Sequence, residues 1–173
     1  MSVAWRHGAC CAMLALLALT AGCTSAAPRG QSHTQVCTVT RVSDGDSLRA
    51  LCPGLGGVTR IRLRGIDAPE LRQRYGQQAR QAVLALCQKQ AIRIPARPAR
   101  DRYQRVLADV HCGGVDVSLR LVQSGLAWVY RPTAAEYPRL VQAERRAQRA
   151  RLGLWGDAHP VAPWTWRRQH ANR

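Results

Sequence analysis

Alternating apolar and polar positions predict short β-strands over the first two thirds of the chain. In one segment Ile61 and Leu63 alternate with arginines, so the arginines share one face of a strand. The Asp-Gly turn at residues 44–46 lies between two runs rich in β-branched residues, as in a hairpin. The predicted strands are residues 36–42, 47–52, 58–66, 91–94 and 106–112.

A helical spacing of apolar residues takes over in the segments between and after these strands. One apolar stripe consists of Ala79, Ala82, Val83, Leu86 and Cys87. Asp116 is the expected cap of a short second helix, which Gly125 ends. A last helix is predicted from Thr133 or Tyr137 to Arg151.

Strands in a row of hairpins, with helices inserted late, predict an α+β fold. The specific expectation is a five-stranded OB-fold β-barrel with about three helices packed on one flank. A chain of 173 residues has room for one such domain and some extra sequence. We expect the domain at residues 34–156 and a C-terminal tail at 157–173. The tail mixes aromatic and basic residues, which can stack on single-stranded nucleic acid. We expect it instead to pack on the barrel or to fray.

The N-terminal residues have the pattern of a secretory signal. A short basic start precedes residues 9–21, which are almost entirely apolar but too few to span a bilayer. Residues 1–22 are therefore predicted as a lipoprotein-type signal peptide, with Cys23 as the lipidated residue and 23–33 as a linker. Ordinary cleavage among residues 24–26 is the alternative. Either way we expect export, as a periplasmic or cell-envelope lipoprotein or as a secreted protein.

The charge balance indicates a polyanionic partner. The chain has 26 basic and 10 acidic residues, a net charge of +16, and its only lysine is Lys89. Such a surplus is typical of proteins that bind nucleic acid or an anionic membrane surface. Coding-DNA composition explains arginine in place of lysine, but it does not explain the shortage of acids.

Four cysteines follow Cys23, and in an exported protein they are candidates for disulfides. No two of them form a close pair such as C-x-x-C, which argues against a zinc site. Four cysteines allow three pairings. We favour Cys37–Cys52, because these residues flank the predicted hairpin almost symmetrically, and this leaves Cys87–Cys112. Four buried free thiols are the alternative.

The few acids are grouped in a way that suggests phosphodiester chemistry. Four lie near the hairpin turn or just after the arginine-rich strand: Asp44, Asp46, Asp67 and Glu70. Hard divalent cations bind several oxygen ligands, and such a hydrolase also needs a base to activate water. Glu70 is the candidate base. Arg62 and Arg105 are candidates for a clamp, because a guanidinium meets two phosphate oxygens at once.

Four segments of the chain resemble, in order and spacing, the signature segments of the thermonuclease (staphylococcal nuclease) family. They are Val42-Ser43-Asp44-Gly45-Asp46-Ser47, Arg62-Leu63-Arg64-Gly65-Ile66-Asp67-Ala68-Pro69-Glu70, Asp101-Arg102-Tyr103-Gln104-Arg105 and Leu121-Val122-Gln123-Ser124-Gly125-Leu126-Ala127. The resemblance extends over residues 36–155. Single segments are weakly specific, but four in register are a strong indication.

The resemblance implies a calcium site. Asp46 and Asp67 match the family's calcium carboxylates, and the Ala68 carbonyl matches a position where the family offers a backbone oxygen. Asp44 matches an acid that lies behind these ligands. Ca²⁺ is therefore the expected cofactor.

The resemblance also implies the residues that act on the substrate. Glu70 matches the residue assigned to activate the attacking water, and Arg62 and Arg105 match the two phosphate-binding arginines. Tyr103 matches a residue beside the bound nucleotide, and Tyr130 is a further expected nucleotide contact. The implied activity is calcium-dependent cleavage of DNA and RNA, with little sequence specificity, that leaves 3′-phosphates. We expect a monomer without a protein partner.

Two positions depart from the family pattern. Gln104 stands where the family has glycine, which is expected to reshape the loop that presents Arg105, and Ser47 replaces a threonine. Two other functions are compatible with the charge: an OB module that holds single strands without cutting them, and a lipoprotein that binds envelope polymers. Neither explains why the cation ligands, the base and the two clamp arginines occur together: Asp46, Asp67, Glu70, Arg62 and Arg105.

Overall fold

The computed structural model describes residues 34–171. The predicted signal peptide at 1–22, the linker at 23–33 and the lipidation site Cys23 lie outside the described residues. Within 34–171, no helix combines the length and apolar character needed to cross a membrane.

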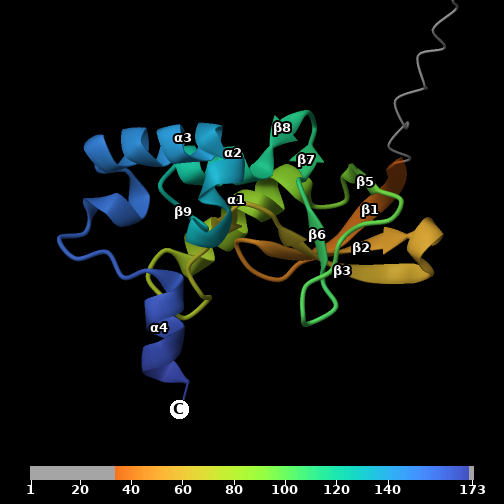
Figure 1. Cartoon of the computed structure of the whole chain (residues 1–173), viewed down its shortest axis with the longest axis horizontal. Helices are drawn as coiled ribbons and strands as arrows, with labels where there is room; N and C mark the ends of the chain where they lie inside the picture. Colours follow the sequence, from red (N-terminus) through yellow and green to blue (C-terminus); the bar gives the residue numbers. More distant parts are fainter. Residues whose placement is uncertain (1–33, 172–173) are drawn as a thin grey trace, which may run out of the picture. The chain divides into compact units, whose positions relative to one another are not determined.

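A strongly curled five-stranded sheet forms the centre of the domain, with strand order β5-β1-β2-β3-β6 (Figure 1). All neighbouring pairs are antiparallel except β3 and β6. The strands are β1 (Thr34–Val42), β2 (Ser47–Cys52), β3 (Gly57–Leu63), β5 (Ala91–Pro95) and β6 (Val106–Ala108). In β3 the apolar Ile61 and Leu63 are buried, while Arg60 is exposed and Arg62 half-buried. The predicted arginine face is thus present.

Helices lie between and after these strands. They are α1 (Gly76–Cys87), α2 (Val117–Gln123), α3 (Pro138–Arg149) and α4 (Pro163–His170). Short 3-10 turns lie at η1 (Pro53–Leu55), η2 (Arg131–Glu136) and η3 (Gly153–Gly156). As predicted, Asp116 caps α2, where its carboxylate accepts a hydrogen bond from the Leu119 backbone N–H at 3.0 Å. The prediction of an α+β fold of OB type is confirmed.

Two predicted strands are shorter than expected. Strand β3 ends at Leu63 because Gly65 turns the chain with a positive φ of 74°; β4 (Ile66–Asp67) then pairs with β9 (Trp128–Val129) outside the main sheet. Strand β6 ends at Ala108. The next residues form a separate hairpin of β7 (His111–Cys112) and β8 (Val115–Asp116) around two glycines of positive φ.

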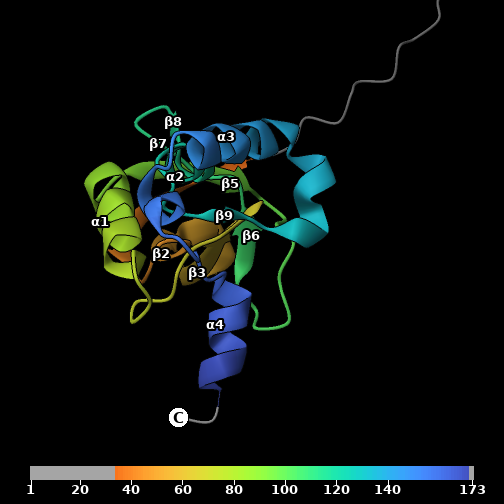
Figure 2. The same ribbon diagram turned by 90° about the vertical axis from the view of Figure 1, so that its left-hand side faces the viewer.

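The last two helices refine the expectation. Pro138 opens α3, as proline favours the first turn of a helix, so the residues before Tyr137 form η2 instead. The C-terminal tail does not fray: it forms α4, which packs on the domain through Trp164 and Trp128, with ring centroids 5.5 Å apart. In Figures 1 and 2 the C-terminal end of this helix projects away from the sheet.

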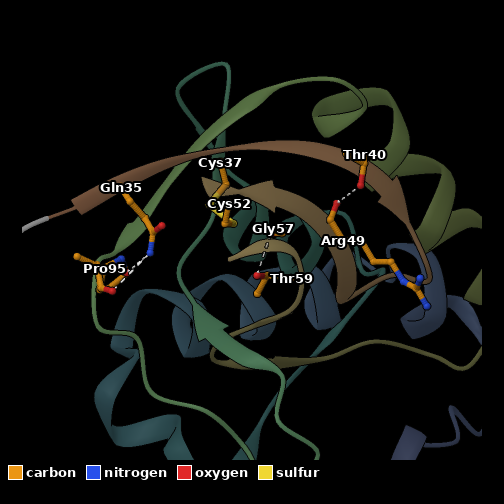
Figure 3. Close-up of a disulfide and its surroundings, with 9 residues drawn as sticks. Gln35, Cys37, Thr40, Arg49, Cys52, Gly57, Thr59 and Pro95 are labelled. Carbon is orange, nitrogen blue, oxygen red and sulfur yellow. Dashed lines mark hydrogen bonds between the residues drawn. A yellow bond between two sulfur atoms is a disulfide. The ribbon is translucent and has the colours of Figure 1, made fainter. Parts of the chain in front are cut away.

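Two disulfides cross-link the domain, and their pairing is the one that the sequence favours. Cys37–Cys52 joins β1 to β2 with a Cα–Cα distance of 4.4 Å (Figure 3). Cys87–Cys112 joins the end of α1 to β7 with a Cα–Cα distance of 5.2 Å. All four cysteines are fully buried, so they also fill part of a core that contains no phenylalanine.

Candidate active site

The acidic turn between β1 and β2 packs directly against the end of β4. Within the turn, the Asp44 carboxylate accepts a hydrogen bond from the Asp46 backbone N–H at 3.0 Å. Gly45 does not have a positive φ; it is needed because a Cβ there would lie 2.7 Å from the Cβ atoms of Ala68 and Ala79. This close approach lets Asp46 Oδ2 accept a hydrogen bond from the Ala68 N–H at 2.7 Å.

Arg62 links the two buried aspartates of the site. Its guanidinium forms an ion pair with Asp46, and Nη2 donates to Asp67 Oδ1 at 2.8 Å. Burial of Arg62 opposes its charge, but the two carboxylates outweigh this and raise its pKa above the ordinary value. Arg62 is therefore a fixed positive charge at the floor of the site.

Asp44 has a different electrostatic environment. Burial, and then the neighbouring charge of Asp46, raise its pKa to about 6. The hydrogen bond from the Asp46 N–H acts in the opposite direction but is outweighed. Asp44 therefore takes up a proton at a higher pH than an ordinary aspartate does.

Arg105 is positioned by its own loop. The Asp101 carboxylate accepts hydrogen bonds from Arg105 Nε at 2.7 Å and from the backbone N–H groups of Tyr103 and Arg105, each at 2.9 Å. Burial alone would raise the pKa of Asp101, but these bonds lower it below its ordinary value. Arg105 Nη1 reaches Ser47 Oγ at 3.5 Å, and that hydroxyl donates to Asp46 Oδ1 at 3.0 Å. One polar chain thus connects the two halves of the site.

Gln104 lies in the tight turn of this loop, with a backbone conformation that favours glycine. Gln104 adopts a φ of 61°, the left-handed conformation that glycine adopts without strain. Its backbone N–H donates to the Asp101 carbonyl at 2.9 Å, which closes the turn. The side chain has therefore been accommodated at a conformational cost, and Arg105 still reaches the site.

A cleft of about 680 Å³ brings the predicted residues together. Eight of them line it: Asp44, Asp46, Arg62, Ala68, Glu70, Tyr103, Arg105 and Tyr130. The two tyrosines are substantially exposed, and Tyr103 lies beside Arg102 and Arg105, whose guanidinium carbons are 4.8 Å and 5.5 Å from the ring centroid. Asp67 is not part of the lining; it is fully buried behind the arginines.

The C-terminal helix α4 contributes a charge that sequence reasoning missed. Arg167 Nη2 donates to Asp67 Oδ2 at 2.8 Å, and Arg167 Nη1 donates to Glu70 Oε1 at 2.9 Å. The bond to Asp67, and then the bond to Glu70 and both carboxylate charges, raise the pKa of Arg167 further above its ordinary value, against the effect of burial. No spacing signal in the sequence links residue 167 to these acids.

The donor set fits a hard cation whose shell is completed by water. Asp46 and Asp67 are buried and share Arg62 as an ion-pair partner, and both offer carboxylate oxygens, the ligand type of hard cations. Among residues 34–171, no group of three or more carboxylate, imidazole or thiol side chains is placed to hold one metal ion. Two carboxylates and a backbone carbonyl would therefore need several water ligands, which Ca²⁺ accepts.

Comparison with known proteins identifies the family. Residues 60–157 match the family model described as staphylococcal nuclease homologue. A Haemophilus influenzae protein named "Uncharacterized endonuclease" is 39% identical over 133 residues, 77% of this chain and 73% of that protein. The micrococcal nuclease of Shigella flexneri is 37% identical over 147 residues, 78% of this chain and 81% of that protein. The chain belongs to the staphylococcal nuclease homologue family. As a member of this family, it is a nuclease that hydrolyses phosphodiester bonds.

The family is also represented in longer proteins. A probable staphylococcal-like nuclease of rice, CAN1, is 42% identical over 114 residues, which are 65% of this chain but only 34% of the rice protein. The matched family segment begins within β3, so it includes Arg62, Asp67, Glu70 and Arg105 but ends before Arg167. The residue that α4 adds to the site thus lies outside the family model's match.

Proposed function

We propose that this nuclease cleaves DNA, RNA or both in a calcium-dependent reaction with low sequence specificity and leaves 3′-phosphates. The observation that supports this most directly is the cleft. Buried carboxylates, an exposed carboxylate and two arginines from separate segments converge there, in a chain of net charge +16. Groups of this kind act on the phosphate backbone, which every sequence shares.

The proposed roles follow from chemistry and position. Arg62 and Arg105 bind the phosphate oxygens and stabilise the charge that grows on them as water attacks phosphorus. Glu70 takes a proton from that water. The bond from phosphorus to the 5′ oxygen breaks, so the products are a 3′-phosphate and a 5′-hydroxyl. A calcium ion held by Asp46, Asp67 and the Ala68 carbonyl would supply Lewis-acid polarisation of the phosphate.

The exposed tyrosines give the cleft a place for the nucleoside portion of the substrate. Tyr103 and Tyr130 are 55% and 40% exposed, so a base can stack on either ring. Stacking of this kind accepts every base, in accord with low sequence specificity.

We also propose that the protein is exported and acts as a monomer, anchored through a lipid on Cys23. The pattern of residues 9–23 supports export, and so do two disulfides, which persist in oxidising compartments. A radiolabelled fatty acid fed to expressing cells should label the wild type but not Cys23→Ser. Release of unlabelled wild-type protein into the medium would favour ordinary signal cleavage instead.

The test of the proposed activity is cleavage of single-stranded DNA and of RNA by the purified protein, with Ca²⁺ and with EGTA. Glu70→Gln keeps the size of the side chain but removes the base, and should lower cleavage by at least about 100-fold while retaining binding. Asp109→Asn is the matched control, because Asp109 is an exposed acid that contacts Tyr137 and does not line the cleft. Binding without cutting in every divalent metal would contradict the proposal and leave an OB module that only holds single strands.

A further inference from the structure

Arg167 of helix α4 forms ion pairs with two of the acids that the proposed reaction requires. The Arg167 guanidinium contacts both oxygens of Asp67, at 2.8 and 3.2 Å, and one oxygen of Glu70 at 2.9 Å. Asp67 is a proposed cation ligand and Glu70 the proposed base. A single side chain thus lies where the cation and the attacking water would be needed.

The helix reaches this position through anchors on its N-terminal side. Trp164 packs edge-on against Trp128 with ring centroids 5.5 Å apart, and Trp128 in turn packs against Trp155 at 4.3 Å. Trp128 lies directly opposite Asp67 in the β4–β9 pair. The Gln73 side chain also donates to the Val161 carbonyl at 2.6 Å, just before the helix. The start of α4 is therefore fastened beside the strand that carries Asp67.

The two arginines on Asp67 are not equally replaceable. Arg62 belongs to the central sheet, its side chain is only 16% exposed, and it also binds Asp46. Arg167 belongs to a short C-terminal helix, and its side chain is 45% exposed. A cation that takes Asp67 as a ligand needs a free carboxylate oxygen, and Arg167 is the partner that can leave with the smaller structural change.

We propose that Arg167 is a built-in competitor of the cation and that α4 is a lid that opens when the cation binds. The inference rests on the proposed cation-dependent function. Without the cation, the guanidinium neutralises Asp67 and covers Glu70, and the site is closed. When a divalent cation takes Asp67, the same displacement frees Glu70 to act on water. The lid therefore makes Glu70 available as a base only when a cation occupies the metal site.

This linkage is reciprocal, so it can be observed in two ways: in the affinity for the cation and in the mobility of the lid. If opening of the lid strengthens cation binding, then the cation must loosen the lid by the same factor. Neither observable requires cleavage of a substrate. Both are measured on the full protein.

The first measurement is calcium affinity by titration calorimetry for the wild type, Arg167→Gln and Arg168→Gln. Arg168 lies on the same helix and loses the same charge, but its side chain donates a hydrogen bond to Thr165 Oγ1, at 3.4 Å, rather than to an acid of the site. We expect Arg167→Gln to bind Ca²⁺ roughly two- to fivefold more tightly than Arg168→Gln, the range for a partly exposed ion pair. Equal affinities of the two variants, or weaker binding by Arg167→Gln, would overturn the proposal.

The second measurement is amide hydrogen exchange of residues 163–170 in the wild type, with Ca²⁺ and with EGTA. We expect faster exchange with Ca²⁺, and fast exchange under both conditions in Trp164→Ala, which removes the anchor. Exchange that Ca²⁺ leaves unchanged or slows would overturn the proposed lid.

The outcomes for the lid and for the proposed function can be told apart. A protein that cuts DNA with Ca²⁺ but fails these two tests has the proposed function but not the lid. A protein that passes both tests but never cuts loses the proposed function alone.

Discussion

The Asp101 carboxylate binds both the backbone and the side chain of Arg105, four residues later in the chain. Its Oδ2 accepts a hydrogen bond from Arg105 Nε at 2.7 Å, while its Oδ1 accepts one from the Arg105 backbone N–H at 2.9 Å. The carboxylate therefore fixes both the loop and the direction of the guanidinium, and it leaves the Nη groups of Arg105 facing Ser47 and the cleft.

Asp101→Asn should weaken cleavage through Arg105 rather than through substrate contact. The amide cannot match the charge-assisted bond to Nε, so the guanidinium loses its fixed orientation. We expect kcat to fall by about 10- to 100-fold, the size of effect that misplacement by about 1 Å produces. Steady-state kinetics on a single-stranded substrate measure this. Asp157→Asn, which breaks only the ion pair with Arg74, is the control and should retain wild-type kcat.

Gln104→Gly should stabilise the protein without changing its activity. A side chain at a φ of 61° brings Cβ close to the backbone carbonyl, and glycine relieves this strain. Glycine also has more conformational entropy in the unfolded chain, which opposes part of this gain. We therefore expect the free energy of unfolding to rise by no more than about 1 kcal/mol. Urea unfolding measures it. Lys89→Gly, at a second position with a φ of 61°, should give a similar gain. A loss of stability at residue 104 would show that the glutamine side chain contributes contacts of its own.

Each disulfide should stabilise the domain by about 3–4 kcal/mol, since the bridged positions are 15 and 25 residues apart. The double variant Cys37→Ser with Cys52→Ser, and the corresponding variant of Cys87 and Cys112, should each unfold at lower urea concentration. A reductant should lower the wild-type midpoint further than either double variant does. A midpoint that reductant leaves unchanged would contradict a structural role for the bridges.

The local elements of this fold were predictable because each has a local cause. The hairpin of β1 and β2 follows from β-branched runs on both sides of a turn, and the start of α2 follows from Asp116 as its cap. The ends of strands were less predictable. Strand β3 stops where Gly65 turns the chain, and β4 then pairs with β9, some 60 residues later. No local pattern predicts such a pairing.

The same distinction explains which site residues could be foreseen. Asp46, Arg62 and Glu70 lie in segments whose spacing is characteristic of the family, so the amino-acid sequence alone identifies them. Arg167 is one of many arginines in a basic tail. Its contact with Asp67 spans 100 residues and depends on how the tryptophans anchor α4, which is a property of packing rather than of sequence pattern.

Gly76→Ala tests how closely the start of α1 controls the proposed base. A Cβ on Gly76 would lie 1.9 Å from the Glu70 carbonyl oxygen, so the backbone of Glu70 must move by about 1.5 Å to restore an ordinary contact. We expect a loss of about 1–3 kcal/mol in stability, typical of overpacking, together with a fall in kcat of up to about 100-fold. Thermal unfolding and kinetics of the same samples separate the two effects.

The matched control is Gly54→Ala, where the close neighbour is the end of the flexible Gln35 side chain, which can swing away. This variant should keep wild-type kcat and lose little stability. If Gly76→Ala is destabilised but cuts at the wild-type rate, the Glu70 carboxylate tolerates displacement of its backbone, and its role is to balance charge rather than to abstract a proton from a fixed position. If kcat falls while KM is unchanged, the small residue at the start of α1 is what holds the proposed base in reach of the attacking water.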